Sequence, residues 1–403
     1  MAPRYVDVPS DLSAIEARSG REVDPRTLGL EPAGIERVWE ATRRMFRTRT
    51  QPAMTLAIRR HGALVLERSI GHARPGELAT PMTPFCTFSV SKAVTAVLMH
   101  LLDERDLLRL DDPVCEYLPE FARHGKDWVT IRHVLTHRAG IPSVAEGEGT
   151  LEVLADRQRV VAALCDAKPV FLPGRRLAYH AVTGGFVLDE IVRRVTGQGL
   201  DTLLIEAVTK PLALSCFSFG LPPERHHEAA ENRFTGWGVP FPFSRLVQRA
   251  LGLPIEEAVA ASNDARWLSA VVPSGNLMAT ADDLARFFEM LRRGGTLDGV
   301  RILAPRTVRR LLVESAYLEP DLTLGLAVRY GQGVMLGAYP FSLFGPDTGH
   351  AFGHYGLVNV VAWADPERAL SAALLTSGKA IIANQLPAFL GFLKAVAVEL
   401  PPV

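Results

Sequence analysis

Apolar residues along this chain recur at two spacings, one typical of helices and the other of strands. Residues 31–46 place them at helical intervals, and residues 53–70 form two short β-prone runs separated by a glycine. These patterns predict a helix followed by a β-hairpin. A longer apolar helical pattern begins near Ser89 and ends around residue 104. The chain therefore begins with elements of an antiparallel sheet and then becomes helical.

Helical patterns continue to about residue 270, with Pro and Gly between them. Short helices are predicted at 131–137 and 182–195, the second closed by a glycine. Between 217 and 267 the periodicity is lost, and aromatic and proline residues accumulate. Irregular stretches of this length inside a compact domain are usually functional, so we predict an apolar covering loop here. Aromatic packing beneath a surface loop explains the same residues equally well.

Strand patterns return in the last third of the chain, between a helix at 284–293 and a final amphipathic helix at 387–399. The predicted strands are 324–330, 357–364 and 369–376. Strands at both ends of the chain with helices between them predict an α+β fold. In this fold, residues 1–88 and 271–403 build one antiparallel sheet flanked by the N- and C-terminal helices. Residues 89–270 form an inserted, mainly helical domain that includes the covering loop.

Composition narrows the possible partners. The 403 residues are 48% hydrophobic, with 44 basic residues against 44 acidic ones. A balanced charge provides no long-range field to gather nucleic acid or acidic lipid, which favours small neutral or weakly charged molecules. The apolar runs are far shorter than the roughly 20 residues that a membrane-spanning helix needs. The N-terminus lacks the pattern of a secretory signal peptide, so we expect a cytoplasmic protein.

Metal, cofactor and disulfide chemistry have no support in the residue pattern. The four cysteines are scattered, and no H-E-x-x-H or clustered Cys/His motif occurs. We therefore expect no metal site, no cofactor and no structural disulfide. The sequence also lacks G-x-S-x-G, the nucleophile motif of α/β-hydrolases.

Ser89 and Lys92 are the first candidate pair for chemistry, at the start of the long apolar helix. A serine hydroxyl is a poor nucleophile unless a neighbouring group removes its proton. Residues three apart share a helix face, and apolar surroundings favour the neutral, proton-accepting amine. The free N–H groups of a helix start also suit an oxyanion. Taken alone, however, the spacing is more often a serine N-cap followed by a surface lysine.

Two further motifs favour a catalytic pair over a helix cap with a surface lysine. Tyr179 follows a Pro-Gly turn, a position from which a phenol can reach into a cleft. His354-Tyr355-Gly356 supplies a glycine that lets a substrate lie along a strand edge. The order S-x-x-K, Tyr, H-x-G resembles the serine β-lactamase and penicillin-binding-protein superfamily, and within it the class C-like esterases called family VIII carboxylesterases, with their acyltransferase relatives. The resemblance covers roughly residues 30 to 400.

This resemblance implies a role for each motif. Ser89 would be the acyl-forming nucleophile, with Lys92 and Tyr179 sharing its proton as general base. The backbone N–H groups of Ser89 and Leu357 would form the oxyanion hole. Residues expected to bind the substrate are His354, Tyr355 and Gly356, with Trp237 and Phe241 from the covering loop.

Two departures from the β-lactam-processing branch narrow the expected activity. Ala181 stands where that branch usually has Asn, and His354 stands where it has Lys. We therefore predict a serine hydrolase that cleaves small carboxylic esters through an acyl-enzyme. The alternatives are an acyltransferase that uses the same site, a weak β-lactamase and a non-catalytic ligand-binding relative. Lys379, which follows a strand, is expected in a surface turn, and the sequence leaves the oligomeric state open.

Overall fold

The computed structural model describes residues 2–143 and 151–403. Residues 144–150, which fall in the predicted helical domain, lie outside the described residues. The main sheet has ten strands in the order β1-β3-β2-β17-β16-β15-β12-β11-β10, with β4 paired to β3. The strands are β1 (Glu16–Arg18), β2 (Ala53–Arg60), β3 (Ala63–Arg74), β4 (Glu77–Leu78), β10 (Ala316–Pro320), β11 (Ala327–Tyr330), β12 (Met335–Leu336), β15 (Phe352–Tyr355), β16 (Val361–Asp365) and β17 (Leu370–Thr376).

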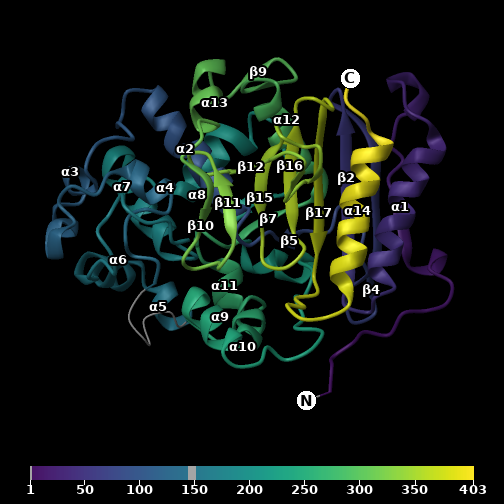
Figure 1. Cartoon of the computed structure of the whole chain (residues 1–403), viewed down its shortest axis with the longest axis horizontal. Helices are drawn as coiled ribbons and strands as arrows, with labels where there is room; N and C mark the ends of the chain where they lie inside the picture. The colour runs from purple at the N-terminus through teal and green to yellow at the C-terminus, as the bar shows by residue number, and fades with distance from the viewer. Residues whose placement is uncertain (1, 144–150) are drawn as a thin grey trace.

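Both ends of the chain contribute to the centre of this sheet. Strand β2 pairs antiparallel with β17, with Leu56 opposite Leu374. Each of the other pairings in the main sheet is also antiparallel. This arrangement confirms the predicted α+β fold, with a hairpin from the N-terminal part joined to strands from the C-terminal part (Figure 1).

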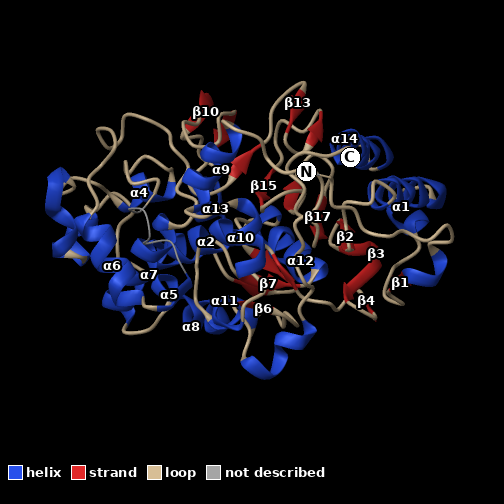
Figure 2. Ribbon diagram, turned by 90° about the horizontal axis from the view of Figure 1, so that it is seen from below, coloured by secondary structure: helices blue, strands red, loops and turns tan. Residues whose placement is uncertain are grey.

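Helices cover both faces of the sheet, because side chains alternate along each strand. Along β2, Met54, Leu56 and Ile58 pack with α1 (Pro32–Phe46) and α14 (Gln385–Glu399). Ala53 and Ala57 face the opposite side, in the core that includes α12 (Ala281–Arg292) and α2 (Ser91–Glu104). Figure 2 shows β2 and β17 between the α1/α14 layer and α12.

The helical part of the molecule surrounds α2. Its helices include α3 (Val114–Tyr117), α4 (Ile131–Leu135), α5 (Leu151–Ala155), α6 (Arg157–Asp166), α7 (Thr183–Thr196) and α8 (Leu200–Leu204). Helix α2 is buried on every side from Ser91 to Asp103, as expected of a helix that is apolar all round. Helix α7 ends at Gly197 in the left-handed conformation, as its sequence predicts. Where the boundary between the two regions lies stays a prediction.

Residues 217–267 differ from the predicted covering loop, because they contain regular structure. They form β6 (Phe217–Phe219), α9 (Phe243–Leu251), α10 (Ile255–Ala261) and α11 (Ala265–Ser269). Pro242 and Pro254 stand at the N-caps of α9 and α10, so these prolines begin helices instead of interrupting them. Strand β6 belongs to a second sheet with β5 (Phe85–Cys86) and β7 (Leu277–Ala279).

The predicted strand at 357–364 begins later than expected, at Val361. Residues 357–360 form a loop in which Val358 and Asn359 adopt positive φ angles of 48° and 58°. The Gly356 N–H donates to the Val360 carbonyl at 2.8 Å and closes this loop. Strand β15 lies before the loop, so the H-x-G motif begins on a strand and ends in the turn. In the described ranges, no helix is long and apolar enough to cross a bilayer.

Candidate active site

Ser89 lies in the turn directly before α2, and its side chain is partly exposed. Phe88, the preceding residue, has a positive φ of 48°. The Ser91 hydroxyl donates to the Phe88 carbonyl and accepts the Leu277 N–H at 3.0 Å, which fixes the start of α2 on β7. The Lys92 N–H donates to the Ser89 carbonyl at 3.1 Å. The predicted helix therefore begins two residues later than Ser89, while the serine keeps its place beside the first turn.

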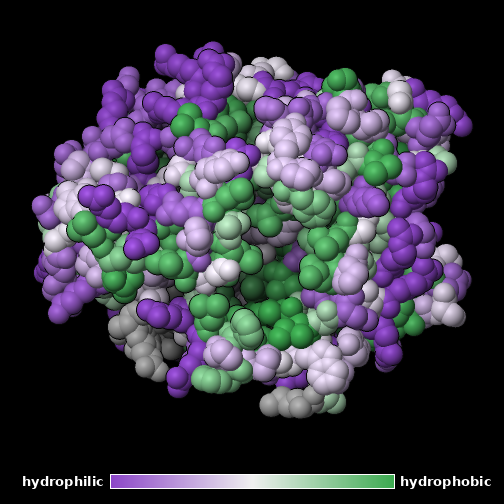
Figure 3. All heavy atoms as spheres, viewed as in Figure 1, coloured by the Kyte–Doolittle hydropathy of each residue, from purple (hydrophilic) through white to green (hydrophobic). Residues whose placement is uncertain are grey.

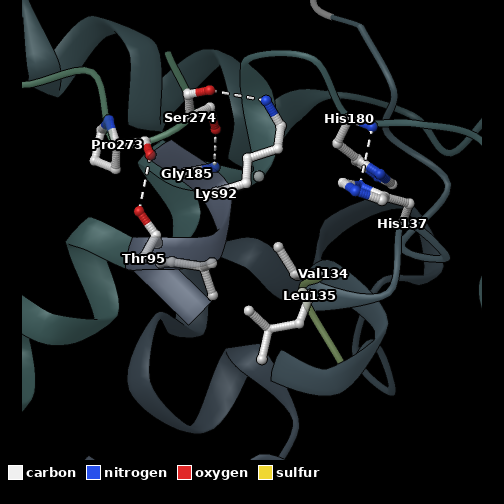
Figure 4. A pocket seen from close by; sticks show the side chains of 12 residues that line it. Lys92, Thr95, Val134, Leu135, His137, His180, Gly185, Pro273 and Ser274 are labelled. Atoms are coloured by element: carbon white, nitrogen blue, oxygen red, sulfur yellow. Dashed lines mark hydrogen bonds between the residues drawn. The ribbon is translucent and has the colours of Figure 1, made fainter. Parts of the chain in front are cut away.

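Among the candidate residues, Lys92 has the most informative hydrogen-bond environment. Its Nζ lies 2.7 Å from the Ala181 carbonyl oxygen, 2.8 Å from the Ser274 carbonyl oxygen and 3.1 Å from Ser89 Oγ. Figure 4 shows the bond to Ser274. Burial holds the pKa of this amine well below its ordinary value. A neutral amine has two N–H bonds and one lone pair, and carbonyl oxygens only accept. When the two carbonyls take both N–H bonds, the lone pair is directed at Ser89 Oγ.

Tyr179 adjoins the same two side chains. Its ring centroid is 4.8 Å from Lys92 Nζ, and its hydroxyl is within hydrogen-bonding reach of Ser89. Burial raises the pKa of the phenol, although the contact with Ser89 lowers it, so the phenol stays protonated at neutral pH. The Tyr179 N–H donates to Asp321 Oδ1 at 3.0 Å. Asp321 lies just beyond the end of β10, so the turn between β10 and β11 positions this tyrosine.

His354 and Tyr355 point to opposite faces of β15, as strand geometry requires. The His354 ring lies 6.3 Å from the Tyr179 ring. Burial lowers the pKa of His354 to about 3. Its Nδ1 lies 2.7 Å from the Tyr355 carbonyl, so Nδ1 bears the hydrogen of the neutral ring. The Tyr355 ring instead packs near Phe344, and its hydroxyl donates to a backbone carbonyl, away from His354.

Gly356 and Leu357 lie next to residues 87–89, which we call the nucleophile segment because Ser89 is the candidate nucleophile. A Cβ at Gly356 would overlap the Thr87 carbonyl oxygen, so this approach requires glycine. Leu357 packs against the apolar cluster that contains Phe88. Within the described part of the chain, the backbone N–H groups of Ser89 and Leu357 donate no hydrogen bond. Two free N–H groups on adjoining segments are what an oxyanion hole needs.

Trp237 and Phe241 lie on the outer surface. The Trp237 N–H donates to the Ile382 carbonyl at 2.8 Å, and its side chain is 46% exposed. The Phe241 side chain is 73% exposed. The structure thus brings Ser89, Lys92, Tyr179 and His354 together and places these two aromatic side chains at the surface.

Three side chains near the site could not be assigned to it from sequence. His137 Nδ1 accepts the His180 N–H at 3.1 Å, and both imidazoles line a 30 Å³ cavity behind Lys92 (Figure 4). Burial lowers the pKa of each of these imidazoles, that of His180 to about 3, so both are neutral at neutral pH. The third side chain is Asp321, which holds the Tyr179 backbone. A backbone contact of this kind leaves no motif in the sequence.

Lys379 is not in a surface turn, and that prediction is wrong. Its side chain is fully buried, with Nζ 4.7 Å from the centroid of the Phe88 ring and 2.6 Å from the Thr376 carbonyl. Burial lowers its pKa to about 7. The cause is the preceding residue, Gly378, which lies so close to the Thr50 backbone that a Cβ would not fit. This approach draws the chain after β17 inward, beneath the nucleophile segment.

Across the described ranges, no group of three or more His, Cys, Asp or Glu side chains is arranged to hold a metal ion.

Comparison with known proteins places this chain in a family. The beta-lactamase family model matches residues 42–385. The esterase/beta-lactamase LipL of Mycobacterium tuberculosis is 30% identical over 92% of this chain and 87% of its own. A penicillin-binding-protein homologue from Caulobacter crescentus has a TM-score of 0.80 at 30% identity, covering 92% of this chain and 99% of the homologue. A family VIII carboxylesterase also has a TM-score of 0.80, at 26% identity over 92% and 98% of the two chains. The chain therefore belongs to the beta-lactamase and penicillin-binding-protein superfamily.

Proposed function

We propose that the protein is a serine hydrolase that cleaves small carboxylic esters through an acyl-enzyme on Ser89. The observation that carries the proposal is the position of Lys92 Nζ, which lies within hydrogen-bonding distance of Ser89 Oγ and of two backbone carbonyls. When the amine is neutral and those carbonyls accept its two N–H bonds, its lone pair is left for the Ser89 hydroxyl. The similarity to an esterase/beta-lactamase and to a family VIII carboxylesterase supports an ester substrate.

In the first half of the reaction, Lys92 Nζ accepts the proton of Ser89 Oγ as the oxygen attacks the ester carbonyl carbon. The negative charge moves to the carbonyl oxygen, which accepts hydrogen bonds from the N–H groups of Ser89 and Leu357. When the intermediate collapses, the bond to the alcohol oxygen breaks. The departing alkoxide takes the Tyr179 hydroxyl proton, and the Lys92 ammonium returns a proton to the tyrosine. The products are an alcohol and an ester of Ser89.

In the second half, water attacks the acyl carbon and loses a proton to the neutral Lys92 amine. The Ser89 oxygen then leaves and recovers that proton, which restores the starting state. Tyr179 acts here as a neutral proton carrier, because its raised pKa makes the phenolate scarce at neutral pH. In this proposal Lys92 is the base and Tyr179 carries the proton, whereas the resemblance implied that the two residues share the proton as general base.

The surroundings of the site favour an ester over a β-lactam. His354 is a neutral imidazole and provides no permanent cation for a carboxylate. Ala181 supplies its backbone carbonyl to Lys92, and its methyl side chain cannot hydrogen-bond an acylamino group. A β-lactam would thus lose two recognition contacts that a simple ester does not need.

Covalent labelling tests the assignment of the nucleophile. After brief exposure to a fluorophosphonate, intact-mass and peptide mass spectrometry should show one adduct, on Ser89, and Ser89→Ala should remain unlabelled. A folded wild-type protein without an adduct, or with an adduct elsewhere, would refute the proposal. Adding a short alcohol to the p-nitrophenyl ester assay separates the two fates of the acyl group, since an acyltransferase would form the new ester.

The pH dependence of kcat/KM should report the lowered pKa of Lys92. Below that pKa the amine is an ammonium with no lone pair, so the rate should fall as the pH falls and level off above it. The apparent pKa of this acid limb of the kcat/KM profile should lie well below 10.5, the ordinary pKa of lysine. A p-nitrophenyl acetate profile between about pH 4 and 10 measures it. A rate that kept rising into the alkaline range would instead indicate a tyrosinate base, contrary to this assignment.

His354→Ala is the control for the same profile. The pKa of His354 is about 3, so its ring is neutral throughout the measured range. The acid limb should therefore stay in place in this variant, even if KM changes. A limb that disappeared with the imidazole would assign the base to His354 and contradict the role of Lys92.

A further inference from the structure

A large apolar groove opens on the face of the molecule shown in Figure 3. Its volume is 510 Å³, and it lies between the β10–β11 hairpin and α14. Figure 3 shows a hollow with hydrophobic walls near the centre of this face. The groove extends to Gly356, the glycine beside the nucleophile segment. Its aliphatic and aromatic lining includes Leu318, Leu326, Leu336, Phe341, Leu386 and Leu390.

Helix α9 adds a second exposed apolar surface beside the β10–β11 turn. None of its nine residues is buried. The Phe243 side chain is 62% exposed and that of Leu246 is 40% exposed. Leu246 Cδ2 lies 3.9 Å from the position that a Cβ would take at Gly325, in the turn between β10 and β11. The apolar side of α9 therefore continues onto that turn, where Leu322 is 56% exposed. We call Phe243, Leu246, Leu322 and Leu326 the apolar rim.

The charge of α9 differs from the balanced charge of the whole chain. The helix carries Arg245 and Arg249 and no acidic residue. Among the described residues, neither guanidinium forms an ion pair, although Arg245 lies over the Phe241 ring at 5.7 Å. An exposed helix with aromatic and aliphatic residues on one side and unpaired arginines on the other is typical of helices that lie in a lipid interface.

The apolar rim is joined directly to the catalytic tyrosine. In the β10–β11 turn, the Leu322 N–H donates to the Leu177 carbonyl at 3.0 Å, and Asp321 accepts the Tyr179 N–H. A lipid surface in contact with Leu322 and Leu326 would therefore lie close to the segment that holds Tyr179. An ester presented from that surface would then lie beside this segment.

We propose that the apolar rim and the arginines of α9 dock the protein on an anionic lipid surface, so that its substrates are esters held in an aggregated lipid phase. This inference rests on the proposed esterase function. The rim would bury its apolar side chains among the lipids, and Arg245 and Arg249 would pair with anionic headgroups. A second copy of the chain would bring the same two arginines to the rim, whereas an anionic lipid surface brings only negative charge, so anionic lipid is the better complement.

Vesicle co-sedimentation tests the docking with the full chain. Wild-type protein should sediment with vesicles of phosphatidylcholine and phosphatidylglycerol, and much less with phosphatidylcholine alone. The double variant Phe243→Ser/Leu246→Ser should bind the anionic vesicles about tenfold more weakly. Arg245→Gln/Arg249→Gln should lose the preference for the anionic composition. The matched control is Leu107→Ser/Val313→Ser, which removes two exposed apolar side chains outside the rim and should bind as wild type.

Activity assays separate this inference from the proposed function. Wild-type hydrolysis of tributyrin should rise steeply once the ester exceeds its solubility. The rate on the aggregated ester should be about tenfold lower in Phe243→Ser/Leu246→Ser. Hydrolysis of dissolved p-nitrophenyl acetate should change less than about twofold in the variant. Rapid acetate hydrolysis without vesicle binding or a tributyrin rise would overturn the docking and leave the esterase. A protein that binds vesicles but hydrolyses neither ester would overturn the esterase function and, with it, the substrate class inferred here.

The oligomeric state decides the remaining alternative. A wild-type dimer in analytical ultracentrifugation that becomes a monomer in Phe243→Ser/Leu246→Ser, with no vesicle binding, would show that a second copy covers the rim and would overturn the proposal. A wild-type protein that stays monomeric and binds anionic vesicles would support it.

Discussion

Replacing Lys92 by methionine is expected to lower kcat/KM for p-nitrophenyl acetate by roughly 10³-fold, within the range that a general base contributes. Methionine is close to lysine in length and suits the buried site, but it has no lone pair basic enough to accept the Ser89 proton. The loss should appear mainly in kcat, because the amine acts on the nucleophile. Ser89→Ala sets the floor of the assay, and stopped-flow or steady-state release of p-nitrophenol measures both variants.

Lys126 offers a matched control for this substitution. It is also buried, its Nζ also donates to two backbone carbonyls, those of Cys165 and Ala167, and it lies over an aromatic ring. Lys126→Met should therefore disturb packing and hydrogen bonding in the same way and leave kcat/KM within about twofold of wild type, as expected away from the site. If the two variants lost activity equally, the effect at Lys92 would be structural and the catalytic assignment would be wrong.

The sequence indicated the side chains of the candidate site more clearly than the groups that surround them. Ser89, Lys92 and Tyr179 belong to motifs, so their side chains were recognisable. The carbonyls that accept hydrogen bonds from Lys92 Nζ belong to Ala181 and Ser274, which lie 89 and 182 residues away in the chain. Every residue has a backbone carbonyl, so no pattern in the sequence marks these two. For the same reason, no sequence pattern indicates that Asp321 accepts a hydrogen bond from the Tyr179 N–H.

The fold was predictable wherever the apolar periodicity was unbroken, as in α1, α2 and the β2–β3 hairpin. The prediction failed where proline and glycine residues are compatible with two different structures. Pro242 and Pro254 suggested an irregular loop, although proline is equally suited to the start of a helix, and here each begins one. Lys379 was expected in a surface turn because it follows a strand, whereas close backbone packing at Gly378 draws it into the core.

The loop after β15 shows how one glycine joins fold and function. Gly356 ends the H-x-G motif, and its backbone adjoins Thr87 on the nucleophile segment. In the described ranges, the N–H of the following residue, Leu357, donates no hydrogen bond. The distance between the two segments therefore fixes the separation of the two N–H groups that are proposed to bind the oxyanion.

Gly356→Ala is accordingly expected to lower kcat by about 10²-fold, the effect of losing one oxyanion donor. The added Cβ would overlap the Thr87 carbonyl oxygen and lie 2.9 Å from Val360 Cβ, so the loop has to move away from Ser89. KM should change less than kcat, because the lost interaction forms in the transition state. The same overpacking should lower the free energy of unfolding by about 1–3 kcal/mol, measured by urea denaturation.

Gly391→Ala distinguishes this local effect from a general effect of adding a methyl group. Gly391 lies in α14, and a Cβ there meets no atom within 4 Å. Alanine in a helix should raise the free energy of unfolding by about 0.5–1 kcal/mol, and kcat should stay unchanged. If Gly356→Ala lost stability but kept its kcat, the Leu357 N–H could not be an oxyanion donor. A loss of kcat at Gly356 with full activity at Gly391 would assign that donor to the loop after β15.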